Sequence, residues 1–176
     1  MLKKIFIGIA MVILVLLGLI MTRPDHFKVS RSGVIQAPPE KIFPYLSNFK
    51  LGEQWSPFDT PELKLKKTFS GEDGKEGSHM TFEGDASGSG DLTILKIVPN
   101  QSVDINLHMT KPFEGSNLIE YSLQPEGEGT KFTWTMSGKA NFITKAIGLF
   151  MDCEKMIGPE FEKGIASLKR VVESQK

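Results

Sequence analysis

The chain has 176 residues, 40% of them hydrophobic, which is enough for one globular domain with a substantial core. It carries 21 basic and 21 acidic residues, so its formal net charge is zero. Nucleic-acid-binding proteins present a basic face, and this balance argues against that class of partner. The single cysteine, Cys153, excludes an internal disulfide, and its apolar neighbours favour a small buried side chain over a reactive thiol.

The N-terminus holds the longest apolar run, IFIGIAMVILVLLGLIM, at residues 5–21. Its 17 uncharged residues reach the lower limit for crossing a bilayer as a helix. A secretory signal peptide is the competing interpretation, but LGLIMTRPD offers neither paired small residues of a cleavage site nor a cysteine for lipid attachment. The sequence therefore favours an uncleaved membrane anchor at residues 1–24 and a domain at residues 25–176.

The basic residues around this run give two opposed indications of its orientation. Lys3 and Lys4 favour a cytoplasmic N-terminus, whereas Arg23, Lys28 and Arg31 favour the reverse. Because only a two-residue basic tail must stay inside, we expect the domain to lie outside the cytoplasm, tethered to the membrane.

After the anchor, the chain reads as one strand, two short helices and six further strands. Residues 26–35 are rich in β-branched and aromatic side chains, and Pro38 and Pro39 suit the first turn of a helix that Pro44 shortens or bends. Between residues 62 and 138, turn signals separate six segments at the spacing of an antiparallel meander. The last three alternate cleanly, with inner faces formed by Val103, Ile105, Leu107 and Met109, by Ile119, Tyr121 and Leu123, and by Phe132, Trp134 and Met136. In LTILKIV (92–98) both faces are apolar, and the pattern does not indicate which points inward.

The last segment is helical, because Phe161, Ile165, Leu168 and Val172 fall on one helical face. Gly158-Pro159 interrupts its beginning, since proline lacks an amide donor and clashes with the preceding turn. We therefore predict a kink or break within two residues of Gly158. A short helix from about residue 141 to 157 would then close one end of a cavity, and a longer one would line it.

Three stretches carry a resemblance to a known family: EQWSPF (53–58), KPFEGSN (111–117) and FITKAIGLFMDCEKMIGPEFEKGIASLK (142–169). With the order of elements, they resemble the helix-grip proteins of the SRPBCC, or START–Bet v 1-like, superfamily. More narrowly, the chain from residue 26 to its end is similar to the bacterial polyketide cyclase/dehydrase and lipid-transport group. This resemblance implies that the membrane of the expected anchor is a bacterial inner membrane. The resemblance implies an α+β fold in which a curved antiparallel sheet of about seven strands wraps around a long C-terminal helix. It also implies a cavity for an apolar ligand, without a set of catalytic residues.

Motifs for catalysis or cofactor binding are not apparent in the sequence. The spacing of the three histidines is not that of metal ligands. The segment GDASGSGD (84–91) lacks the ending of a phosphate-binding loop, so a hairpin turn is the sounder interpretation of it. We therefore predict no metal, no cofactor and no catalytic constellation. An inner apolar surface remains, which core packing would also explain, and its candidate ligand-binding residues are Trp55, Phe58, Phe82, Phe113, Tyr121, Trp134, Met136, Phe150, Met151 and Met156.

Three functions are compatible with these observations. The leading hypothesis is a membrane-tethered module that binds an apolar small molecule or lipid. The alternatives are a cyclase- or dehydrase-like enzyme acting in the cavity, and a non-catalytic interaction domain of a membrane complex. An empty apolar cavity favours the first, converging polar groups favour the second, and a filled core favours the third. The sequence identifies neither the ligand nor the oligomeric state.

Overall fold

The computed structural model describes residues 2–84, 88–140, 142–149 and 153–174. Seven strands and five α-helices form these parts of the chain, with one short 3-10 turn. In chain order they are α1 (Leu2–Met21), β1 (His26–Ile35), α2 (Pro39–Ser47), α3 (Phe49–Gly52), the 3-10 turn η1 (Pro61–Leu63), β2 (Lys66–Ser70), β3 (His79–Gly84), β4 (Gly88–Val98), β5 (Ser102–Lys111), β6 (Gly115–Glu126), β7 (Gly129–Lys139), α4 (Phe142–Ile147) and α5 (Cys153–Glu173).

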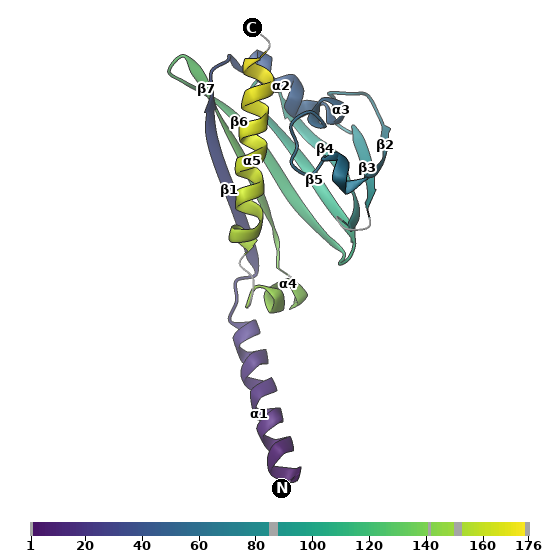
Figure 1. Ribbon diagram of the computed structural model, residues 1–176, viewed down its shortest axis with the longest axis vertical. Helices are drawn as coiled ribbons and strands as arrows, with labels where there is room; N and C mark the ends of the chain where they lie inside the picture. Colours follow the sequence, from purple (N-terminus) through teal and green to yellow (C-terminus); the bar gives the residue numbers. More distant parts are fainter. Residues whose placement is uncertain (1, 85–87, 141, 150–152, 175–176) are drawn as a thin grey trace.

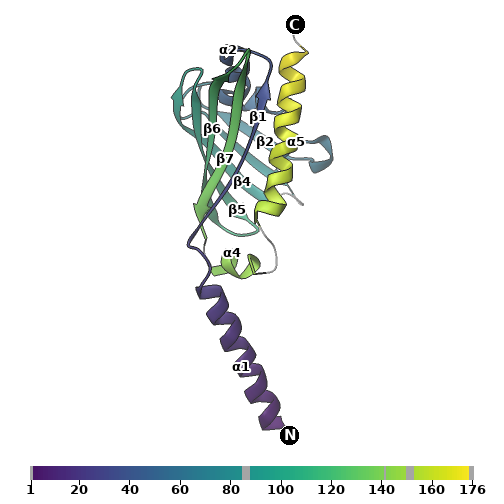
Figure 2. The same ribbon diagram turned by 90° about the vertical axis from the view of Figure 1, so that its left-hand side faces the viewer.

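The strands form one antiparallel sheet in the order β1-β7-β6-β5-β4-β3-β2. Consecutive strands from β2 to β7 are neighbours, and β1 closes the series by pairing with β7. The sheet curves, and α5 runs along one of its faces beside β1 (Figures 1 and 2). The predicted α+β architecture, a sheet of seven strands around a long C-terminal helix, is confirmed.

The inner face of the sheet follows the alternation seen in the sequence. A strand places successive side chains on opposite faces, so every second residue of β5, β6 and β7 faces α5. The buried members of this face are Val103, Ile105, Ile119, Tyr121, Leu123, Phe132, Trp134 and Met136. From α5 they meet Phe161, Ile165, Leu168 and Val172, all of which are buried as the helical periodicity predicts.

Strand β4 departs from simple alternation, which explains why its inner face was ambiguous. Its pairing with β5 shifts register between Ile94 and Lys96, so Leu95 and Lys96 are both exposed instead of alternating. The strand also begins at Gly88 and thus includes part of the segment that we interpreted as a turn. A glycine is required at Gly90, where a Cβ atom would lie 2.3 Å from the carbonyl oxygen of His108.

The predicted break at Gly158-Pro159 is wrong, whereas a kink within two residues of Gly158 stays a prediction. Helix α4 ends at Ile147, and α5 begins at Cys153 and continues through Pro159 to Glu173. Arg31 on β1 holds the two sides of this site together, donating hydrogen bonds to Glu154 at 3.2 Å and to Glu162 at 2.7 Å. Gly158 lies beside that guanidinium, where a Cβ atom would be 2.3 Å from Arg31 Nη2. Contacts with the sheet on both sides of the proline favour one continuous helix.

Helix α1 projects from the end of the domain that also carries α4 (Figures 1 and 2). It is long and apolar enough to cross a membrane from Lys3 to Met21, properties that an N-terminal signal sequence shares. Most of its large hydrophobic side chains are exposed. Helix α4 contacts α1, and Lys145 forms an ion pair with Asp25 in the connection between α1 and β1.

Candidate ligand-binding cavity

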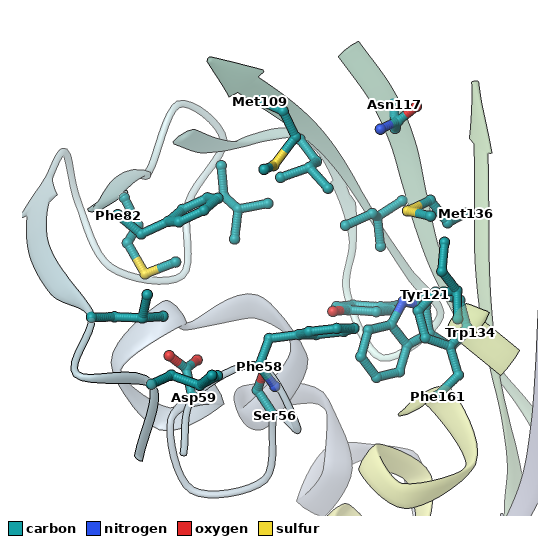
Figure 3. Close-up of a pocket in the computed structure, with 17 residues that line it drawn as sticks. Ser56, Phe58, Asp59, Phe82, Met109, Asn117, Tyr121, Trp134, Met136 and Phe161 are labelled. Atoms are coloured by element: carbon teal, nitrogen blue, oxygen red, sulfur yellow. The ribbon is translucent and has the colours of Figure 1, made fainter. Parts of the chain in front are cut away.

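A cavity of about 370 Å³ lies between the inner face of the sheet, the N-terminal half of α5 and the loop that follows α3. This volume falls in the range of small-molecule sites, which extends from roughly 300 to 1,000 Å³. The sheet supplies one wall because its central strands β5, β6 and β7 turn every second side chain toward α5. The loop after α3 supplies the opposite wall (Figure 3).

Its lining is mostly apolar, with four polar side chains: Ser56, Asp59, Asn117 and Tyr121. The apolar residues are Phe58, Leu63, Leu65, Met80, Phe82, Leu92, Leu107, Met109, Ile119, Trp134, Met136, Ile157 and Phe161. Three of them are methionines, and Figure 3 labels two, Met109 and Met136. Flexible, polarisable methionines adapt to ligands of varied shape, which suits an apolar binding site.

Trp134 is the centre of the aromatic cluster at one end of the cavity. Its ring stacks on Phe161 of α5 with a centroid separation of 4.1 Å, and it meets Tyr121 edge-on at 5.5 Å and Trp55 at 5.3 Å. Such pairs add to the stability that burial alone provides. Within the described residues, Trp134 Nε1 is buried without a hydrogen-bond partner.

An ion cluster lies behind the opposite wall. Lys67 on β2 pairs with Asp59 and, at 2.9 Å, with Glu53, and the side chains of Lys67 and Asp59 are largely buried. Burial by itself lowers the pKa of Lys67, but the hydrogen bonds and charges of the two carboxylates together raise it above its ordinary value. Only Asp59 of these three groups lines the cavity.

Tyr121 joins the aromatic cluster to the polar side of the cavity. Burial, and secondarily the charge of Asp59, raises the pKa of its hydroxyl well above the usual range. The phenol is therefore neutral near physiological pH and remains a hydrogen-bond donor. Figure 3 shows the Tyr121 hydroxyl directed toward the open space between Phe58 and the sheet.

The structure brings together half of the residues that the sequence suggested. Phe58, Phe82, Tyr121, Trp134 and Met136 line the cavity between the sheet and α5. Phe113 and Met156 do not; both are exposed. Phe150 and Met151 lie outside the described residues.

Trp55, another suggested ligand-binding residue, does not line this cavity. It is only 4% exposed and lines a separate small cavity of about 50 Å³ beneath α2 and α3. Its indole nitrogen donates a hydrogen bond of 2.9 Å to the carbonyl oxygen of Tyr45. The turn after α3 thus folds inward, because an internal acceptor allows the indole to be buried.

Sequence reasoning missed most of the remaining lining residues. Leu107, Met109 and Ile119 could have been identified, since they share a strand face with residues that were assigned to the core. Phe161 was placed on the inner face of the last helix but not in the site. Asp59 carried no such signal, because its turn, SPFDTP, is recognisable only as a break between elements.

The histidines lie away from the cavity lining. His79 hydrogen-bonds Thr93 at 2.8 Å, and His108 lies 3.2 Å from Asp91. Within the described ranges, no three His, Cys, Asp or Glu side chains are grouped so that they could hold a metal ion.

Comparisons with known proteins agree with this architecture. The solved structures that superpose on the chain include an uncharacterised Staphylococcus aureus protein, SA2116 (TM-score 0.63, 15% identity, covering 86% of this chain and 96% of that one). Another is the Aha1 dimer from Colwellia psychrerythraea (TM-score 0.60, 21% identity, covering 84% of this chain and 96% of that one). A third is MLL2253 from Mesorhizobium loti (TM-score 0.59, 23% identity, covering 82% of this chain and 98% of that one). At these identities the likeness shows the fold alone. The search of curated proteins found no match. The family model described as polyketide cyclase / dehydrase and lipid transport matches residues 26–173, and the chain therefore belongs to that family, within the SRPBCC fold superfamily.

Proposed function

We propose that this protein is a membrane-tethered module that binds an apolar small molecule or lipid in the cavity between the sheet and α5. The observation that carries the proposal is the open, mostly apolar cavity of about 370 Å³. A core evolved only for packing leaves few voids larger than a water molecule. Lipid transport also appears in the description of the family, which supports a ligand of this class.

The tether in this proposal is α1, with residues 1–24 as the anchor and residues 25–176 as the binding domain. Only a few residues separate the end of α1 from β1, and the Lys145–Asp25 ion pair connects α4 to this junction. Phe142 and Ile143 of α4 are exposed close to it. Apolar side chains at that position suit the boundary between lipid headgroups and acyl chains, so the domain would rest on the membrane surface.

The polar groups of the cavity favour binding over acid–base catalysis. An efficient general acid or base has a pKa near the working pH, whereas the environment of Tyr121 moves its pKa away from neutrality. Asp59 is held in an ion pair with Lys67. The cyclase or dehydrase alternative would need a proton-transfer group that is free to change its charge.

Quenching of tryptophan fluorescence by a brominated lipid provides a direct test. The only two tryptophans, Trp55 and Trp134, lie in the domain, and bromine quenches an indole only at short range. The full chain would be placed in phosphatidylcholine nanodiscs and titrated with the methyl ester of dibromostearic acid. We expect saturable quenching with about one probe per chain if the probe occupies the cavity between the sheet and α5.

A matched pair of variants controls this experiment. Leu92 and Leu107 face each other across β4 and β5 on the cavity wall, so Leu92→Phe with Leu107→Phe should fill the space and reduce saturable quenching. Leu95→Phe places the same added bulk on the outer face of β4 and should leave quenching unchanged. Wild-type protein without saturable quenching, or equal quenching in the filled variant, would overturn the proposed function.

A further inference from the structure

The polar side chains that line the cavity differ in charge. Among the lining residues that the structure describes, Asp59 is the single charged side chain, and Ser56, Asn117 and Tyr121 are neutral. Figure 3 shows the Asp59 carboxylate on the same wall as Ser56 and Phe58, across from the sheet. A ligand in this cavity therefore meets one ionic group, and that group is an anion.

The partner of Asp59 does not cancel this charge. Lys67 is shared between Asp59 and Glu53, so the cluster of three groups keeps a net charge of −1. Lys67 itself stands behind the wall and is not a lining residue. Its side chain is only 12% exposed, and its hydrogen bonds to the two carboxylates hold it there.

On the other side of the cavity, Tyr121 offers a neutral donor. Its side chain lines the cavity, and no hydrogen bond to its hydroxyl is found within the described ranges of the chain. A hydroxyl that faces an apolar cavity without a protein partner forgoes the free energy of one hydrogen bond, which a ligand oxygen can restore. The negative field of Asp59 adds to burial in keeping this phenol protonated.

We propose that the cavity selects uncharged molecules with a long apolar body and one hydrogen-bond acceptor, such as an ester, ketone or ether, and discriminates against fatty-acid anions. This inference rests on the proposed function. The apolar walls exclude the water that would solvate a carboxylate, and Asp59 repels it. An uncharged ester or ketone avoids both penalties and can accept a hydrogen bond from Tyr121.

The test compares dibromostearic acid with its methyl ester in the same nanodiscs, by quenching of the two tryptophans. The two probes share one chain and differ only in the charge of the headgroup. Above the ionisation range of the acid, we expect the ester to bind about tenfold more tightly, a conservative figure for like charges that face each other across a protein cavity. As the pH falls and the acid becomes neutral, its affinity should approach that of the ester, which should itself change little.

Two variants test whether the uncancelled charge of Asp59 causes the discrimination. Asp59→Asn should reduce the preference for the ester to within about threefold. Each probe is compared between wild type and variant, so its partition into the bilayer is the same in both measurements and cancels. Glu53→Gln leaves Lys67 to neutralise Asp59 alone, so it should also weaken the preference although Glu53 does not line the cavity. Thermal unfolding of both variants shows whether they remain folded.

The outcomes separate this inference from the proposed function. If neither probe quenches saturably, the binding function itself fails. If the ester and the ionised acid bind equally, or Asp59→Asn leaves the preference unchanged, the binding function stands and the selectivity inference is overturned.

Discussion

The indole of Trp134 on β7 stacks on the ring of Phe161 on α5, with centroids 4.1 Å apart and planes inclined by 11°. The two residues are 3% and 1% exposed, and both also line the cavity. This pair therefore joins the last helix to the sheet and at the same time forms one end of the candidate binding site.

Replacement of Phe161 by alanine should destabilise the domain strongly. The substitution removes a fully buried ring and its stacking contact with Trp134, for which we expect a loss of about 3–5 kcal/mol in the free energy of unfolding. Chemical denaturation followed by circular dichroism measures this loss. Phe142→Ala is the matched control, because Phe142 is exposed and its truncation should cost less than about 0.5 kcal/mol.

The two glycines of α5 should respond differently to alanine. Ordinarily Gly→Ala inside a helix stabilises by about 0.5–1 kcal/mol. At Gly164 the new Cβ atom would lie 2.7 Å from Trp134 and 2.9 Å from the ring of Pro57, neither of which can move freely, so overpacking should cost about 1–3 kcal/mol.

At Gly158 the new Cβ atom would meet only the end of the Arg31 side chain, which can swing away from it. The ion pairs of Arg31 would weaken, but exposed ion pairs contribute little, and Gly158→Ala should stay within about 1 kcal/mol of wild type. Thermal melts of both variants test the contrast. Equal stability of the two would contradict the tight packing of Gly164 against Trp134.

Alkaline pH should destabilise the domain through Tyr121 and Lys67. Both side chains have a raised pKa in the folded state, so the native protein keeps protons that the unfolded chain loses above about pH 10. Stability is therefore fully present below that pH and falls as the pH rises further. Tyr121→Phe should make the fall less steep by up to about 1.4 kcal/mol per pH unit, as measured by urea denaturation across the alkaline range. Superimposable alkaline profiles for wild type and Tyr121→Phe would contradict the burial of a neutral phenol.

A charge in the middle of α1 should release the protein from membranes. Leu14 is an exposed residue of this helix, and Leu14→Arg should cost roughly 2.5–3.5 kcal/mol of insertion free energy. Cell fractionation should show the variant moving to the soluble fraction, while the circular dichroism of the domain stays unchanged. Wild-type protein that is already soluble, or that is cleaved near Met21, would instead indicate a signal sequence.

The sequence alone determined the order of elements and most of the core. Alternation along β5, β6 and β7 and the helical period of α5 depend on backbone geometry, in which each residue's face follows from its position. For that reason the pattern of apolar residues was sufficient to assign Val103, Phe132 and Leu168 to the interior, where all three are buried. Three of the suggested cavity residues, Tyr121, Trp134 and Met136, were found in the same way, because they lie on those strand faces.

The tertiary structure decided the features that depend on contacts between distant segments. The bulge after Ile94, where Leu95 and Lys96 are both exposed, arises from the pairing of β4 with β5. The continuity of α5 at Pro159 accompanies the ion pairs that Arg31 makes on both sides of it. Trp55 is buried because Tyr45 supplies an acceptor. Asp59 becomes part of the cavity only when its loop folds over the sheet and meets Lys67. Periodicity reports which face of an element is apolar, but side chains in loops acquire their environment from whatever the fold brings beside them.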